Sequence, residues 1–169
     1  MNIVYASDEG YCPHMAVSIV SLIEHNQSEP LTFHILSDGI PMEMEDQLRA
    51  MVRGYGKKIV FYPIEHLMEE LKGQIVGLDT GRFRITTLAR LLMGSILPRM
   101  VTKVLYLDCD TVVLRSLAPL YRLHLGDHIA AMAAEPTIYP EVKAQLGLTE
   151  EEVYFNAGML LLNLSAWRM

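Results

Sequence analysis

The feature that most constrains the fold is an alternation of short apolar runs with longer helical patterns. Apolar runs at Ile3–Ala6, Leu31–Leu36 and Lys58–Tyr62 each have the length and composition of a buried strand. Helical patterns that begin at Pro13 and Pro41 separate them. Strands separated by single helices predict βαβ units and a mostly parallel sheet, whose strands all end at the same edge.

The rest of the chain continues in the same manner. A weak helix is expected over His66–Leu71 and a loop over Gly73–Arg84, and a longer helix from Thr86 or Thr87 to Pro98. The remaining expected elements are strands at Lys103–Leu107, Ile129–Ala133 and Phe155–Leu164, extended chain at Thr111–Leu114 and a short helix at Pro140–Leu146.

Length and composition fit one ordinary globular domain. The chain has 169 residues and a net charge of −6, from 14 basic and 20 acidic side chains. Nucleic acid is a poor candidate partner for such a chain, because binding it needs many basic contacts to phosphate. Two cysteines form no disulfide framework, so we expect a cytoplasmic protein with free thiols. We find neither a signal-peptide pattern nor an apolar run long enough to span a bilayer.

Carboxylates follow several of the predicted strands. Asp8 and Asp38 each stand just beyond an apolar run, and Asp108 and Asp110 follow Lys103–Leu107 directly. If the chain stays extended there, Asp108 and Asp110 project from the same face. Two carboxylates so close repel each other unless a cation lies between them, and Mg²⁺ or Mn²⁺ takes oxygen ligands together with substrate phosphates. The alternative is a pair of solvated carboxylates in a turn, but the position at the end of an apolar strand favours a metal site.

Other phosphate-binding devices are missing from the sequence. No G-x-G-x-x-G pattern follows the first strand, which argues against a dinucleotide-dependent dehydrogenase. The segment Gly54–Lys57 lacks the spacing of a P-loop and follows a helix, so we interpret it as a helix stop. A nucleotidyltransferase would also use strand-end carboxylates and Mg²⁺. Such enzymes typically carry a Gly-rich, basic loop after the first strand, which Asp8–Tyr11 does not resemble.

The chain resembles the family 8 retaining glycosyltransferases, which include bacterial lipopolysaccharide galactosyl- and glucosyltransferases and glycogenin. The matching stretches, in the order of the family, are Ile3–Asp8, Ile85–Leu91, Lys103–Asp110, Leu125–Asp127 and Tyr154–Leu164. The resemblance implies a GT-A fold, which is a Rossmann-like three-layer α/β arrangement around a mostly parallel sheet. It also implies a UDP-sugar donor, Mn²⁺ or Mg²⁺ as cofactor, a carbohydrate or lipid-linked acceptor and a place in lipopolysaccharide biosynthesis.

The resemblance assigns roles to individual residues. Ala6 and Asp8 match the strand end that holds uracil and ribose, where Asp8 would accept a hydrogen bond from the uracil ring; a turn-forming Asp is the alternative. Arg90 matches an arginine near the donor, which contacts phosphate or sugar or orients Asp108 by a salt bridge. Asp108 and Asp110 match the metal-binding D-x-D motif.

Four further positions belong to the expected donor site. Cys109 would offer its backbone near the ribose, with an inert thiol. Asn156 and Ala157 match the segment that touches the donor sugar, and a buried Asn there should have a hydrogen-bond partner. Glu135 stands where the family usually has an Asp that binds sugar hydroxyls.

The sequence also departs from the family. Gly10 and Arg82 replace a polar residue and a His that many members have near the nucleotide. Residues 1–169 are expected to form a single nucleotide-sugar-binding domain without the family's C-terminal part, which carries a third metal ligand, a His, and acceptor-binding residues. We therefore expect a metal-dependent retaining hexosyltransferase. The alternatives are a UDP- and metal-binding module without transfer, or a fragment that an oligomer contact holds together. Peripheral membrane association would concern the full-length family.

Overall fold

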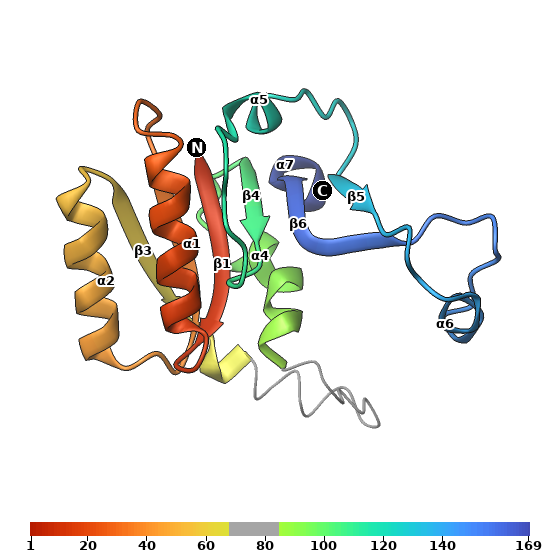
Figure 1. The fold of residues 1–169 in the computed structure, drawn as a ribbon, viewed down its shortest axis with the longest axis horizontal. Helices are drawn as coiled ribbons and strands as arrows, with labels where there is room; N and C mark the ends of the chain where they lie inside the picture. The colour runs from red at the N-terminus through yellow and green to blue at the C-terminus, as the bar shows by residue number, and fades with distance from the viewer. Residues whose placement is uncertain (68–84) are drawn as a thin grey trace.

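A single mixed sheet forms the centre of the molecule. The computed structural model describes residues 1–67 and 85–169. Its strand order is β3-β2-β1-β4-β6-β5 (Figure 1). The strands are β1 (Asn2–Asp8), β2 (Thr32–Asp38), β3 (Lys58–Pro63), β4 (Lys103–Leu107), β5 (Ala130–Ala134) and β6 (Phe155–Asn163). Strands β1 to β4 run parallel, and β6 runs antiparallel to both β4 and β5, which confirms the predicted, mostly parallel sheet.

Helices cover both faces of the sheet and give three layers. The described helices are α1 (Cys12–Glu24), α2 (Met42–Gly54), the 3₁₀ helix η1 (Ile85–Leu92), α4 (Met93–Ile96), α5 (Ala118–Tyr121), α6 (Pro140–Gln145) and α7 (Leu164–Trp167). In Figure 1, α1 and α2 stand side by side over β1 to β3. The predicted α/β class and three-layer architecture are confirmed.

Alternation along the strands divides the core into two clusters. On β1, Tyr5 packs with Ile19 of α1, whereas Val4 points to the opposite face and packs with Met93 of α4. Successive strand side chains alternate in this way because the backbone is pleated. On β4, Tyr106 lies on the face of Val4. Residues two apart share a face, so Asp108 leaves the strand on that same side.

The helix expected from Thr86 or Thr87 to Pro98 forms only in part as an α-helix. It begins as the 3₁₀ helix η1 and becomes α-helical for the four residues of α4. Leu97 then adopts an extended conformation with ψ 143°, as expected for a residue that precedes a proline. Residues 65–67 are helical, whereas the rest of the expected helix His66–Leu71, the loop Gly73–Arg84 and Arg82 lie outside the described residues.

Strands β5 and β6 are less buried than their apolar sequences suggested. The register of β4 with β6 ends at Leu107 opposite Met159, so the earlier residues of β6 pair with β5 alone. Residues 155–157 are exposed, and burial in β6 is complete only at Leu160–Leu162. Together with α6, these residues form an arm that stands away from the body (Figure 1). The prediction of a strand buried along its whole length was therefore wrong.

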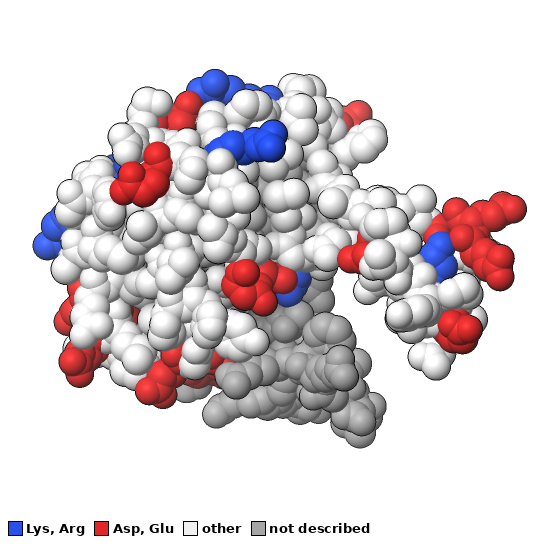
Figure 2. Space-filling model, viewed as in Figure 1, with Lys and Arg blue, Asp and Glu red and all other residues white. Residues whose placement is uncertain are grey.

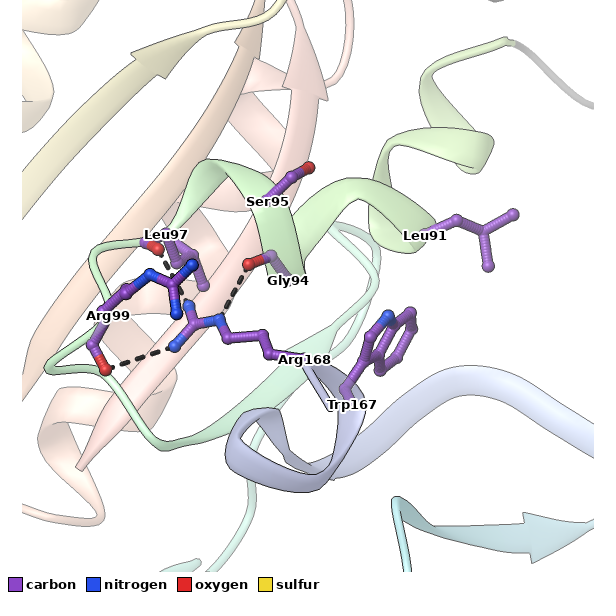
Figure 3. A pocket seen from close by; sticks show the side chains of 7 residues that line it. All are labelled: Leu91, Gly94, Ser95, Leu97, Arg99, Trp167 and Arg168. Carbon is purple, nitrogen blue, oxygen red and sulfur yellow. Dashed lines mark hydrogen bonds between the residues drawn. The ribbon is translucent and has the colours of Figure 1, made fainter.

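Helix α7 packs against α4 near the end of the chain, where the two helices border a shallow depression (Figure 3). The Arg168 guanidinium donates hydrogen bonds to the carbonyl oxygens of Gly94 (2.7 Å), Leu97 (2.8 Å) and Val101 (2.9 Å). The contacts to Gly94 and Leu97 supply partners to carbonyls that the end of α4 leaves unpaired. Within the described ranges, no helix has both the length and the apolar composition that crossing a bilayer requires.

Candidate functional site

The expected donor residues gather where the strand order changes direction. From β1 the chain crosses over to β2 and β3 on one side and later to β4 on the other. In open α/β sheets, ligands bind beyond the carboxyl ends of the strands at this switch point. Asp8 ends β1, and Asp108 directly follows β4. The two strand ends are joined by the Cys109 Sγ, which donates to the carbonyl oxygen of Ala6 at 3.2 Å.

Asp8 has a structural contact in addition to its place at the switch point. Its Oδ1 accepts a hydrogen bond from the backbone N–H of Tyr11 at 3.0 Å, which shapes the turn into α1. The turn-forming role is thus present, while the expected contacts of Asp8 and Ala6 with uracil and ribose stay a prediction. Asp38 ends β2, one strand further from β4, so it is less central to the switch point.

The D-x-D segment is a turn. Strand β4 ends at Leu107, and residues 109 and 110 are in turn conformation. The Thr111 hydroxyl donates to the Asp108 carbonyl at 2.8 Å and closes the turn. The premise that the chain stays extended through Asp110 was therefore wrong, whereas residues 111–114 belong to no helix, strand or turn. Asp108 is half-buried and Asp110 is exposed.

Two donors hold one oxygen of the Asp108 carboxylate. Its Oδ1 accepts the Tyr106 hydroxyl at 2.9 Å and Nη2 of Arg90 at 3.2 Å. The Arg90 guanidinium also lies 4.8 Å from the centre of the Tyr106 ring and donates through Nη1 to the Ala157 carbonyl. The salt bridge to Asp108 is thus present, as one interpretation of Arg90 expected. It joins η1, β4 and β6 at one point.

The other oxygen, Oδ2, lies at a notch beside Gly158, which is the room that a side chain at this position would need. A Cβ built on Gly158 would lie 2.8 Å from Oδ2 of Asp108 and 3.1 Å from Oδ1 of Asn156. The backbone of Gly158 approaches equally closely, since its carbonyl accepts the N–H of Asp108 at 2.8 Å. Two side-chain oxygens therefore border this notch. A glycine inside a strand often marks such a close approach, and that was the available signal for Gly158.

Asn156 lies at the base of the arm and is exposed, so the expectation of a buried Asn was wrong. Its partners are nevertheless clear. Its Oδ1 accepts the N–H of Gly158 at 2.8 Å, and its Nδ2 donates to Oε2 of Glu135 at 3.2 Å. Hydrogen bonds from the Thr137 hydroxyl and from Asn156 lower the pKa of Glu135. Glu135 is thus set as an ionised acceptor beside Asn156, which suits the expected binding of hydroxyl groups.

Cys109 is buried beneath the turn. Burial raises the pKa of its thiol to about 12, so the thiol stays protonated at neutral pH. Because the thiolate is the reactive form, this side chain is inert, as the sequence interpretation held.

The donor set of the site fits a hard divalent cation. Mg²⁺ and Mn²⁺ prefer oxygen ligands and take few of them from the protein when phosphates supply the rest. Asp108 offers Oδ2 beside the notch, and Asp110 offers an exposed carboxylate. In residues 1–67 and 85–169 there is no group of three or more His, Cys, Asp or Glu side chains that would enclose a metal ion. Such a set fits a cation that is shared with a bound diphosphate.

Comparison with known proteins decides the family. The profile of glycosyl transferase family 8 matches residues 2–169. The chain belongs to this family. It is similar to the lipopolysaccharide 1,3-galactosyltransferase of Salmonella typhimurium, with 29% identity over 98% of this chain and 49% of that protein. A lipopolysaccharide 1,2-glucosyltransferase of Escherichia coli is also 29% identical, over 98% of this chain and 48% of its own length.

A solved structure gives the same result for the fold. The galactosyltransferase LgtC in complex with donor and acceptor sugar analogues has a TM-score of 0.85 and 34% identity, over 99% of this chain and 59% of LgtC. The GT-A fold expected from the sequence is thereby confirmed. The chain spans about half the length of the curated relatives named above.

Sequence reasoning missed Tyr106 and Gly158, although it placed the neighbouring Asp108, Arg90 and Ala157 in the donor site. These five residues meet in the structure through the contacts described above. Asp8, Ala6 and Cys109 border the same edge of the sheet. Glu135 and Asn156 form a second pair that reaches this centre through Gly158.

Proposed function

We propose that this family 8 chain forms the donor-binding part of a retaining glycosyltransferase. In this proposal a hexose, galactose or glucose, passes from a UDP-sugar to an acceptor hydroxyl, with Mn²⁺ or Mg²⁺ as cofactor. The observation that carries it is the partly exposed Asp108 carboxylate at the switch point, with one oxygen held by two donors and the other close to Gly158. The similar lipopolysaccharide transferases support the hexose and a carbohydrate or lipid-linked acceptor.

The reaction breaks the bond from the anomeric carbon to the UDP oxygen and forms one to the acceptor oxygen. In a retaining transfer the acceptor attacks from the face that UDP leaves, and the proton of the acceptor hydroxyl passes to the departing diphosphate oxygen. A bound divalent cation would offset the charge that develops on departing UDP. Asp108 and Asp110 would hold it there, and Asp8 would bind the uracil ring.

The remaining residues would position the donor. Arg90 lies beside Asp108 and brings positive charge to the edge where the diphosphate would lie. Glu135 and Asn156 form a hydrogen-bonded pair whose oxygens and amide suit sugar hydroxyls. Backbone groups of Cys109 and Ala157 complete the proposed set. We place the reaction in the cytoplasm, since both cysteines are free and buried.

Calorimetric titration of UDP, with and without Mn²⁺, tests the proposal. We expect UDP to bind in the presence of Mn²⁺, and the binding to be lost with EDTA and in Asp108→Ala and Asp110→Ala. The matched control is Asp46→Ala, which removes an exposed carboxylate on α2 and should bind UDP like the parent chain. Equal UDP affinity with and without the metal, or unchanged binding in both site variants, would contradict the assignment.

A second candidate function is a module that binds UDP and metal without transferring sugar. It is favoured by the small protein ligand set, because no group of three metal-ligating side chains is present among the described residues. Incubation with UDP-galactose and UDP-glucose plus Mn²⁺ separates the two functions. Release of UDP that depends on Asp108 indicates an enzyme, whereas binding without turnover indicates the module.

A further inference from the structure

We propose that Tyr106 is a positioning residue for the cation site, acting through Asp108. Its hydroxyl, together with Arg90, occupies Oδ1 of Asp108 and leaves Oδ2 as the atom that binds the divalent cation. This inference rests on the proposed function and deepens it, because it assigns the metal bond to one oxygen and names the side chain that selects it.

The first step is the geometry of the donors. Tyr106 lies on β4, Asp108 directly follows that strand two residues later, and the Tyr106 hydroxyl reaches Oδ1 at 2.9 Å. Arg90 reaches the same oxygen at 3.2 Å from η1. Two donors on one oxygen fix the rotation of the carboxylate, since turning it would break both bonds.

The second step is the environment of the hydroxyl. The Tyr106 side chain is only 2% exposed, so little water competes for its hydroxyl. That hydroxyl donates to a carboxylate oxygen. A hydrogen bond to a charged acceptor is stronger than one between neutral groups.

The third step is that the backbone groups of Asp108 are also engaged. Its N–H donates to the Gly158 carbonyl at 2.8 Å, and its own carbonyl accepts the Thr111 hydroxyl at 2.8 Å. That hydroxyl is joined to the Ser18 hydroxyl, at 3.0 Å. Among the described residues, no hydrogen bond reaches Oδ2, which borders the Gly158 notch. The Asp108 side chain is 34% exposed, so its carboxylate is accessible to a ligand.

The test compares Mn²⁺ affinity in the parent chain and in Tyr106→Phe. Electron paramagnetic resonance of free Mn²⁺, at saturating UDP, gives the affinity, and urea unfolding without metal gives the stability. Removing a group that orients a metal ligand typically weakens metal binding about 10- to 100-fold, so we expect at least a tenfold loss. The control is Tyr121→Phe, whose hydroxyl donates to the Lys103 carbonyl at the opposite end of β4. It should leave Mn²⁺ affinity unchanged.

The outcomes are distinguishable. Equal Mn²⁺ affinity in Tyr106→Phe and the parent chain would overturn the positioning role and leave the proposed function intact. A Tyr106→Phe chain that fails to fold would show that the hydroxyl serves the fold, and would overturn the inference as well. A parent chain that binds no Mn²⁺ in the presence of UDP would refute the proposed function and this inference with it.

Discussion

At the scale of single residues, the site depends on the side chains around Asp108 and on one residue that has none. Tyr106 and Arg90 hold Oδ1, and Gly158 leaves room for Oδ2 because it has no side chain. A carboxylate that is free to rotate loses conformational entropy when it binds a cation. A carboxylate that hydrogen bonds already hold in place loses less. The affinity for the divalent cation should therefore depend on residues that contact Asp108 without binding the metal.

Substituting Gly158→Ala should block the site. The added Cβ would lie 2.8 Å from Oδ2, which is too close, so the carboxylate must turn away from the notch. We expect Mn²⁺ affinity to fall by about tenfold or more, as for loss of an orienting group. The control is Gly54→Ala at the end of α2, where nothing lies within 4 Å of the new Cβ. Mn²⁺ binding by Gly158→Ala that matches this control would show that the notch has no part in the site.

At the scale of elements, the N-terminal βαβ units could be predicted from the sequence and the later half only in part. Apolar runs such as Ile3–Ala6 identify buried strands because helices cover both of their faces. The same pattern wrongly predicted burial over all of Phe155–Leu164. The first residues of this strand lie beyond the end of β4, so they pair with β5 alone. Asp108 was predictable from its place after a strand. The contact between Asp108 and Gly158 was not, since it depends on the register of two strands far apart in the sequence.

A buried polar network joins the three strands β1, β2 and β3. His34 of β2 contacts the Tyr62 hydroxyl through Nδ1 at 3.0 Å and Oδ1 of Asn2 through Nε2 at 3.2 Å. A neutral ring with its proton on Nε2 donates to Asn2 and accepts from Tyr62. Burial lowers the pKa of His34 from 6.5 to about 4.

This shift predicts a pH-dependent stability. Between pH 6.5 and 4 the unfolded chain binds the extra proton, so His34 stabilises the fold above pH 6.5 and this contribution is lost as pH falls toward 4. For one proton the slope of the unfolding free energy reaches up to about 1.4 kcal/mol per pH unit. Urea unfolding at pH 7.5 and pH 5 gives the free energy of unfolding at each pH. Between these two pH values, His34→Gln should lose less of this free energy than the parent chain. His25→Gln, at an exposed His, should retain the parent's slope, and an identical slope in all three chains would refute this role.

At the scale of the whole molecule, the sheet brings together residues from separated parts of the chain. Strand ends at Asp8 and Asp108 meet at the switch point, η1 contributes Arg90, and β6 contributes Gly158. Acidic side chains gather at the tip of the arm in Figure 2. The segment that includes α6 carries the exposed residues Glu141, Glu150, Glu151 and Glu152. The arm connects to the site through Asn156, which contacts both Glu135 and Gly158.

The most direct test of this account is a crystal structure of the chain with UDP and Mn²⁺, with the metal located by anomalous scattering. The account predicts one Mn²⁺ that bridges the diphosphate and Oδ2 of Asp108, with Oδ1 still bound to Tyr106 and Arg90. A metal on Oδ1, or a Mn²⁺ and UDP that lie away from the carboxyl ends of β1 and β4, would contradict it.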